Sequence, residues 1–253
     1  MKPVNHKFTQ VELEQKLEDL QKKSEQKDVF IASVVHDLKN LMVPILTRTE
    51  MLQLSIPEAK KQELLVQLNK SCFTLMDALQ KMVNICKDAN NAGDFQPAHF
   101  NLHNLVIEVI DALEVHYQQK NINIINLVSE TITVFVDRNM MLSILMNLLG
   151  NAIKFTNIGG KIEMNSKEIG QNIWKISVKD NGIGINEQQM YNLIKKNQYY
   201  TTPGTMGESG TGLGLMLCVS QLHRNHSLLE AHNNPDGGAT FSFNLSNEEF
   251  VIG

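Results

Sequence analysis

Two stretches in the first third of the chain carry apolar side chains at alternating steps of four and three, and this heptad pattern constrains the fold more than any other feature. Such spacing places the apolar side chains along one seam of a helix, where they pack against another helix. The first seam spans residues 13–52, with polar interruptions at Ser24, Lys27 and Arg48, and the second spans residues 61–86. The two seams predict two long helices.

The connection between the seams reads LSIPEAK and carries the signals of a short turn. Ser55 can cap a helix, and Pro57 occupies a position where a helix can start. Two helices joined by a short turn form an antiparallel hairpin. Val35, Met42 and Thr49 add a second stripe beside the first seam, so one hairpin leaves apolar surface to bury. The sequence therefore predicts that two hairpins pair as a homodimeric four-helix bundle.

Composition limits the classes of protein to which the chain can belong. Its 253 residues include 23 basic and 27 acidic side chains, a net charge of −4, so a general nucleic-acid-binding protein is not expected. Three scattered cysteines without a CxxC pair argue against a disulfide framework or a metal cluster. There is no run of about 18 apolar residues and no signal-peptide core. We therefore expect no membrane segment in this chain and a cytoplasmic location, either as a soluble protein or as the cytoplasmic portion of a longer membrane receptor.

Helix and strand signals alternate in the second half of the chain. We expect a helical or coiled-coil lead-in over 1–28, the hairpin over 29–90, a linker over 91–100 and a second domain over 101–248. The elements expected in that domain are helices at 101–120, 140–156 and 212–226, strands at 131–137, 160–169 and 172–180, and a hairpin around Asp236-Gly237-Gly238. This order predicts an α/β sandwich, in which helices cover one face of a mostly antiparallel sheet.

The stretch NLLGNAIKF carries a polar stripe. Asn147, Asn151 and Lys154 are separated by steps of four and three and share one helix face. An amide pair and a cation on one face are suited to hold a metal ion and phosphate oxygens. A solvated polar face explains the same stripe equally well, because such stripes are ordinary on amphipathic helices.

The stretch SVKDNGIGIN places Asp180 at the end of a strand, followed by Gly182 and Gly184. A buried carboxylate at this point can accept a hydrogen bond from an exocyclic amine such as that of adenine, and glycines allow close backbone approach. The alternative is a plain Asp-Asn-Gly turn. Asn186, with Gln189 three residues later, indicates that a helix begins after the loop.

The stretch GESGTGLGLMLC brings Gly210, Gly212 and Gly214 to the start of an apolar helix. Backbone N–H groups at a helix start, with glycines clearing the approach, form an anion cradle. The pattern is neither a P-loop nor GxGxxG. A flexible glycine linker is the alternative, although such linkers seldom run into an apolar helix.

The long polar segment between Ile185 and Gly207 suggests a lid, in which Lys195 and Lys196 are better explained as surface charges than as phosphate ligands.

The order of four motifs resembles a sensor histidine kinase of two-component systems. HDLKN at 36–40 resembles the phospho-acceptor box of that family, NLLGNAIKF its N box, and DNGIGI and GTGLGL its two glycine boxes. The resemblance spans Val29 to Phe243. It implies a dimerisation and histidine phosphotransfer hairpin followed by a GHKL-type catalytic domain with the Bergerat ATP-binding fold, which gyrase, MutL-type proteins and related chaperones share. It also implies ATP and Mg²⁺ as cofactors and a response regulator as partner.

The resemblance assigns a role to each matching residue. It implies that His36 is phosphorylated, that Asn147 coordinates Mg²⁺, that Asn151 and Lys154 lie near the phosphates, and that Asp180 binds the adenine amine. The glycine-box residues that it assigns to the nucleotide site are Gly182, Gly184, Gly210, Thr211, Gly212, Leu213 and Gly214.

Two departures from the family pattern stand out. Where the family often has the phenylalanines of a lid box, this sequence has Ile194 and Asn197, so we expect the lid to dock differently and assign it no catalytic role. Lys39-Asn40 stands where many members have Arg-Thr.

The heptad register predicts where the acceptor histidine points. With Leu38 at position a and Val34 at d, His36 falls at the outermost position f and is expected to face solvent. An ordinary histidine, with a pKa of about 6.5, is mostly neutral at pH 7, as a nucleophile must be. Asp37 can orient the ring or accept its proton. Asn40 lies on the same helix face, where the family can orient a water for dephosphorylating the partner.

Pro44 lacks an amide N–H and predicts a kink in the helix. The kink is explained equally well as a tolerated defect or as a bend that lets the acceptor segment change shape.

The sequence favours an ATP-dependent autokinase that passes phosphate from His36 to an aspartate of a response regulator, with phosphatase activity towards that regulator as a possible addition. A superfamily ATPase or ATP clamp is the second hypothesis, and the His36–Asp37 pair argues against it. A silent dimeric scaffold is the third, and the intact nucleotide motifs argue against it.

Overall fold

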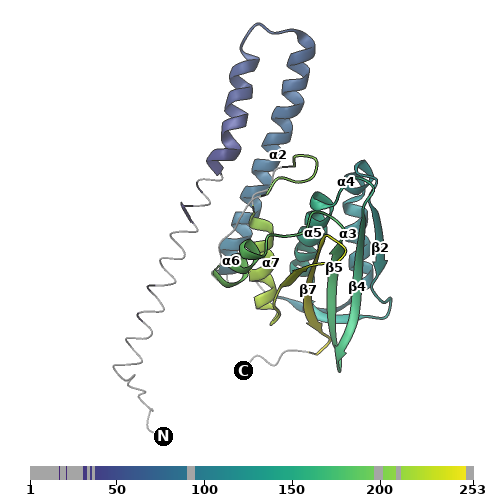
Figure 1. Cartoon of the computed structure of the whole chain (residues 1–253). Coiled ribbons are helices and arrows are strands. Elements are labelled where there is room, and N and C mark those ends of the chain that lie inside the picture. The colour runs from purple at the N-terminus through teal and green to yellow at the C-terminus, as the bar shows by residue number, and fades with distance from the viewer. Residues whose placement is uncertain are drawn as a thin grey trace. The chain divides into compact units, whose positions relative to one another are not determined.

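The computed structural model describes residues 38–89, 95–196, 202–208 and 212–248, together with Leu17, Gln21, Ile31, Ala32 and Val35. The chain divides into two compact units, with the boundary between Asp77 and Ala78. Figure 1 shows the elements of both units.

The first unit contains the predicted helical hairpin. One helix spans 38–52, and five residues, 53–57, separate it from α2 (Glu58–Ala89). The Pro57 carbonyl accepts hydrogen bonds from the backbone N–H groups of Lys60 and Lys61, so Pro57 immediately precedes the first turn of α2, close to the predicted start. The helix 38–52 continues through Pro44. The predicted hairpin is therefore confirmed, and the kink at Pro44 stays a prediction.

Arg48, which interrupts the first seam, ties the two helices together. Its guanidinium donates to Gln67 Oε1 at 3.3 Å and to Ser71 Oγ at 3.0 Å, both on α2, and to the Pro44 carbonyl at 3.1 Å. The seam predicted on α2 is partly wrong. The predicted seam includes Leu65, which is exposed, whereas the preceding Leu64 is buried. The α2 residues that bond to Arg48, Gln67 and Ser71, likewise lie one position before the predicted seam residues Leu68 and Cys72.

The second unit is built on two sheets. The larger has the strand order β2-β4-β5-β7-β6, formed by β2 (Asn123–Leu127), β4 (Lys161–Gly170), β5 (Ile173–Asp180), β7 (Ala239–Ser246) and β6 (Glu230–Asn233). The β2–β4 pair is parallel and the other three pairs are antiparallel. The mostly antiparallel sheet, the paired strands β4 and β5, and the hairpin around Asp236-Gly237-Gly238 are thus confirmed.

A two-stranded sheet pairs β1 (Pro97–Asn101) with β3 (Thr133–Asp137) in antiparallel register. The end of the segment that we expected to be linker is therefore a strand. Its sequence, PAHFN, carries no alternating apolar pattern, and it becomes a strand because β3 supplies its hydrogen-bond partners. Strand β2 was also not predicted.

Five helices are described in the second unit in addition to the carboxyl end of α2: α3 (Leu102–Ala112), α4 (Glu114–Gln119), α5 (Arg138–Phe155), α6 (Glu187–Lys196) and α7 (Leu213–Arg224). The prediction of one helix over 101–120 is wrong, because Leu113 leaves helical geometry and separates α3 from α4. Its side chain is buried in the core at that break. Asp137 caps α5 by accepting from the N–H groups of Asn139 and Met140.

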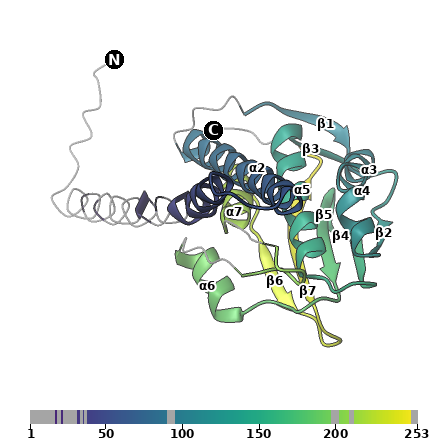
Figure 2. The same ribbon diagram turned by 90° about the horizontal axis from the view of Figure 1, so that it is seen from above.

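The core of this unit lies between the larger sheet and its helices. Helix α5 contacts α3 on one side and α7 on the other, and Figure 2 shows it between them. Alternate residues of β4 and β5 are buried, as expected for a sheet with one covered face, whereas β7 is buried at every position from Ala239 to Phe243. The buried strand residues include Ile162, Met164, Ile176, Val178, Phe241 and Phe243, which pack in one cluster with Ile144, Leu145, Leu148 and Leu222 of the helices. The predicted α/β sandwich is confirmed.

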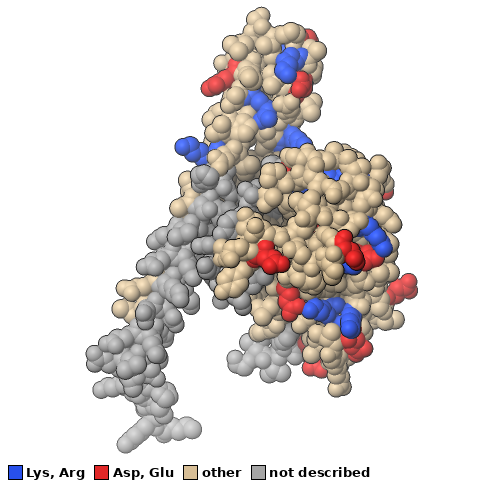
Figure 3. Space-filling model, in the orientation of Figure 1, with Lys and Arg blue, Asp and Glu red and all other residues tan. Residues whose placement is uncertain are grey.

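The surface carries both signs of charge. On the face shown in Figure 3, basic and acidic side chains of the described residues are interspersed rather than gathered by sign. Of the helices that the structure describes, none combines the length and the apolar character needed to cross a bilayer.

Candidate functional site

The polar stripe of α5 is partly buried rather than solvated. Asn147, Asn151 and Lys154 are all of intermediate exposure. The Asn147 amide nitrogen donates to the Ser143 carbonyl at 2.8 Å, which fixes the orientation of the amide and of its oxygen. The Lys154 ammonium donates to the Thr202 carbonyl at 2.8 Å and lies 4.7 Å from the centre of the Phe155 ring. These contacts favour a built site over an ordinary polar face.

Asp180 is a buried carboxylate at the end of β5, with 4% of its surface exposed. Its Oδ1 accepts hydrogen bonds from the backbone N–H of Gly182 at 2.9 Å and of Ala239 at 3.2 Å. Burial raises the pKa of Asp180 above its ordinary value, and the two backbone hydrogen bonds offset part of that rise. With Oδ1 occupied by these bonds, Oδ2 is the oxygen available to a ligand donor.

The first glycine box is packed against the carboxyl end of α5. A Cβ atom on Gly182 would collide with the Phe155 carbonyl, and that carbonyl accepts a hydrogen bond from the Ile183 N–H at 3.1 Å. Gly184 has a positive φ of 77°, and the Asn233 side chain holds Ile185 by bonds to both its N–H and its carbonyl. A plain solvent-exposed turn would not show such contacts on both sides.

The second glycine box meets the polar stripe of α5. Gly212 caps α7 with a φ of 70°, a left-handed conformation that glycine adopts without strain, and the side chain of Leu213 is fully buried. A Cβ atom on Gly214 would lie 2.5 Å from Asn147 Oδ1. The structure therefore brings two motifs 67 positions apart (214 − 147) into direct contact.

The segment between the glycine boxes begins with a helix, as its sequence indicated. Asn186 caps α6 by accepting from the Gln189 N–H at 3.0 Å. Met190 of α6 is buried in the core, so the first part of this segment is anchored to the domain. The role of the segment as a lid stays a prediction.

Several candidate residues fall outside the described part of the chain. They are His36, Asp37, Gly210, Thr211 and Asn197. Asn40, on the helix 38–52, is described and exposed.

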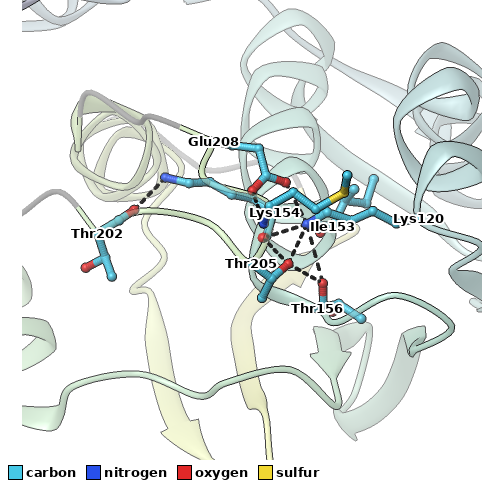
Figure 4. Close-up of polar contacts among 8 residues, drawn as sticks. Lys120, Ile153, Lys154, Thr156, Thr202, Thr205 and Glu208 are labelled. Atoms are coloured by element: carbon cyan, nitrogen blue, oxygen red, sulfur yellow. Dashed lines mark hydrogen bonds and ion pairs between the residues drawn. The ribbon is translucent and has the colours of Figure 1, made fainter.

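Sequence reasoning missed two groups of polar residues around the motifs. Asn234 donates to the Asp180 carbonyl at 2.8 Å and accepts from the Thr240 hydroxyl at 2.6 Å. These two residues are buried and hold the β6–β7 hairpin against the Asp180 loop. The other group is centred on Lys120, in a segment where a lysine has no distinguishing pattern, and Figure 4 shows its contacts.

Comparison with known proteins agrees with this geometry. Residues 136–249 match the family model described as histidine kinase-, DNA gyrase B-, and HSP90-like ATPase. The histidine protein kinase SaeS of Staphylococcus aureus is 24% identical over 251 residues, covering 96% of this chain and 70% of SaeS.

Two solved structures share the fold. The histidine kinase AdeS of Acinetobacter baumannii superposes with a TM-score of 0.69 at 20% identity, covering 85% of this chain and 98% of that one. The histidine kinase ThkA, solved in complex with the response regulator protein TrrA, gives 0.67 at 22% identity, covering 92% and 66%.

The site combines a sheet covered on one face by helices, a buried aspartate after a strand and two glycine boxes packed against α5. With the match over residues 136–249, these features define an ATP-binding domain of this ATPase family. The related kinases match nearly the whole chain, which supports a sensor histidine kinase of two-component signalling with a GHKL-type catalytic domain.

Proposed function

We propose that this chain phosphorylates its own His36 from ATP and passes the phosphoryl group to an aspartate of a response-regulator receiver domain. The family supports the reaction, and the ThkA complex with TrrA supports the kind of partner. The observation that carries the proposal is the environment of Asp180, a buried carboxylate whose Oδ1 is fixed by two backbone N–H groups.

The adenine amine is the ligand donor that suits Asp180. A carboxylate held in a buried site accepts an N–H group strongly, and an unsatisfied partner there is costly. Gly182 leaves the adjoining wall free of side-chain atoms, because its backbone packs directly on Phe155. The residues of this chain therefore fit a nucleotide base next to Asp180.

The phosphates and Mg²⁺ are assigned to the α5–α7 side of the site. The Asn147 amide nitrogen is engaged with Ser143, so its oxygen is the atom presented next to Gly214, and oxygen ligands are those that Mg²⁺ prefers. We assign Asn147 to the metal, Asn151 and Lys154 to phosphate oxygens, and Gly210, Thr211, Gly212, Leu213 and Gly214 to the backbone cradle. When bound, Mg²⁺ supplies neutralisation of the charge on the phosphate oxygens.

The transfer step needs little covalent chemistry from the protein beyond the attack by His36. A neutral imidazole nitrogen of His36 attacks the γ-phosphorus, the bond from that phosphorus to the bridging oxygen breaks, and ADP leaves with the electron pair. The imidazole proton passes to Asp37 or to water. Catalysis then rests on positioning and charge stabilisation.

The hairpin is the proposed dimer interface. Met42 and Leu46 are exposed on the helix 38–52, and Val66 and Met76 are exposed on α2. Pairing two hairpins through these residues would complete a four-helix bundle. We place the phosphotransfer hairpin at 29–90 and the catalytic domain at 101–248.

Incubation of the full chain with γ-labelled ATP and Mg²⁺ tests the proposal. We expect acid-labile, base-stable label that is lost in His36→Gln and kept in His116→Gln, a matched change at an exposed histidine of the second unit. Label that persists in His36→Gln would contradict the assignment of the acceptor.

Asn40 is proposed to assist dephosphorylation of the regulator, because its amide is exposed four residues after His36. We expect Asn40→Ala to retain autophosphorylation and to slow loss of phosphate from a phosphorylated receiver domain. Equal rates of dephosphorylation with both chains would exclude this role.

A further inference from the structure

Lys120 is a buried cation that no motif of the sequence accounts for. It follows α4, and 2% of its surface is exposed. Lysine is almost never this buried unless its ammonium group is paired and hydrogen-bonded, because the charge loses its hydration. Its partners therefore indicate what the residue does.

Three of those five partners belong to the carboxyl end of α5. The Lys120 ammonium donates to the carbonyls of Ile153 at 2.9 Å and Lys154 at 2.8 Å, and lies 3.4 Å from that of Thr156. These carbonyls carry the negative end of the helix dipole, where a cation is favourable. Figure 4 shows the ammonium group among them.

The other two belong to the segment 202–208, which precedes the second glycine box. The ammonium group lies 2.7 Å from Thr205 Oγ1 and 2.6 Å from Glu208 Oε1. Thr205 adds its own bonds to the same helix end, with its N–H donating to the Lys154 carbonyl at 3.1 Å and its hydroxyl lying 2.8 Å from the Thr156 carbonyl.

Glu208 also organises the segment internally. Its Oε2 accepts from the Met206 N–H at 2.8 Å, and its own carbonyl accepts from the Gly204 N–H at 2.9 Å. Desolvation would raise the pKa of Glu208, but the hydrogen bond from Lys120 and those from the backbone bring it below its ordinary value. The carboxylate is therefore charged at neutral pH, and the pair with Lys120 is ionic.

These contacts join the segment to a residue of the nucleotide site. Lys154 provides the carbonyl that both Lys120 and Thr205 bind, and its ammonium group donates to the Thr202 carbonyl. Gly212, the N-cap residue of α7, follows Glu208 by four positions. The segment is thus fixed to the helix end that carries Lys154, and in sequence it shortly precedes the helix whose Gly214 meets Asn147.

We infer that Lys120 is a positioning residue of the nucleotide site, which sets the affinity for nucleotide by holding the segment 202–208 against the end of α5 through Thr205 and Glu208. The inference rests on the proposed function, because it takes the α5–α7 side as the phosphate site. A purely structural cap of α5 needs the three carbonyl contacts but not the two contacts to the segment. Buried ion pairs also contribute little net stability compared with apolar packing, which leaves geometry as their main effect.

The test removes only the contacts that Lys120 makes with the segment 202–208, through Thr205 and Glu208. In the full chain, Thr205→Val deletes the hydroxyl with little change in shape, and Glu208→Gln deletes the charge. We expect each to raise the Kd for a non-hydrolysable ATP analogue with Mg²⁺, measured by calorimetry, by about tenfold, as for loss of a hydrogen bond to a charged group. We also expect faster hydrogen exchange at the amides of 204–208, while exchange in β4 and β5 stays unchanged.

Glu108→Gln is the matched control. Glu108 pairs with Arg138 at the amino end of α5, and both side chains are about half exposed. Its replacement should change the Kd by no more than about twofold, as for a surface ion pair. Lys120→Met should give the largest increase in Kd and also a lower melting temperature, because it uncaps α5.

The outcomes separate this inference from the proposed function. If wild type binds the analogue, Asp180→Asn binds it much more weakly, and Thr205→Val and Glu208→Gln bind like Glu108→Gln, the positioning role of Lys120 is wrong and the nucleotide site stands. If wild type does not bind the analogue, or Asp180→Asn binds it equally well, both fail. Weaker binding by both segment variants with faster exchange at 204–208 supports the inference.

Discussion

The two units of this chain solve the burial of apolar side chains in different ways. The second unit has a closed core, in which helices and a sheet bury residues such as Leu148 completely. In the first unit, Leu64 is the one apolar side chain that is buried among those the structure describes, and it keeps 6% of its surface exposed, whereas Leu46 is 57% and Val66 69% exposed. A sheet covered by helices can complete a core within one chain, but a two-helix hairpin cannot.

This difference matches the division of tasks that we propose. A nucleotide site needs groups held in fixed positions, which a closed core supplies. A phosphate acceptor needs to be presented on a surface, and a helical stem completed by a second copy presents it on the outside. The unit with the site should therefore be stable at any protein concentration, and the hairpin should depend on pairing.

The largest effect is expected from a cavity in the closed core. Leu148→Ala removes a side chain with no exposed surface and should lower the free energy of unfolding of the second unit by about 2–5 kcal/mol. Denaturant unfolding at two protein concentrations measures it, and the loss should be the same at both. Val115→Ala, at an exposed site on α4, is the control and should lose less than about 0.5 kcal/mol.

A smaller effect, confined to self-association, is expected from a charge on the exposed stripe of the hairpin. Leu46→Glu places a carboxylate in the proposed interface and should weaken dimerisation by about tenfold or more, measured by sedimentation equilibrium. Nucleotide affinity should stay unchanged. Leu228→Glu makes the same substitution at a comparably exposed site in the second unit and should leave the dimer intact. Equal dimerisation of the two variants would show that this stripe is not the interface.

The smallest expected effect is on the free energy of unfolding, which burial of the ionised Asp180 carboxylate lowers. Since the pKa of Asp180 is raised by burial, its ionised form is disfavoured in the folded state. Its contribution to stability is most favourable at low pH and is lost as the pH rises through the folded pKa. Asp180→Asn should therefore match or exceed wild-type stability at pH 7, by about 1 kcal/mol at most, and the advantage should vanish in acid. Thermal melts at pH 7 and pH 3.5 check this, and marked destabilisation at pH 7 would mean that the charge has a folded-state partner.

The sequence predicted the parts of the fold that local patterns determine. The hairpin follows from heptad spacing, and the paired strands β4 and β5 follow from alternation. The break at Leu113 and strand β1 were not predicted, because the first arises from burial in the core and the second from pairing with β3, and neither leaves a local signal.

The same distinction holds for the site. Asp180 and the glycines stand in recognisable motifs, because the backbone must turn or approach closely at those positions. Lys120 does not, since the side-chain and carbonyl groups that it binds lie 33 to 88 residues further along the chain. Only the three-dimensional structure brings those groups together around its ammonium group.

The central claim, that Asp180 recognises adenine, is tested most directly by the preference for ATP over GTP. Adenine offers an amine where guanine offers a carbonyl oxygen, so a carboxylate should accept the first and repel the second. We predict that wild type binds an ATP analogue at least about a hundredfold more tightly than the matching GTP analogue, that Asp180→Asn loses most of this ratio, and that Asp111→Asn, at an exposed position on α3, keeps it. Equal affinities for the two analogues in wild type, or an unchanged ratio in Asp180→Asn, would contradict the account.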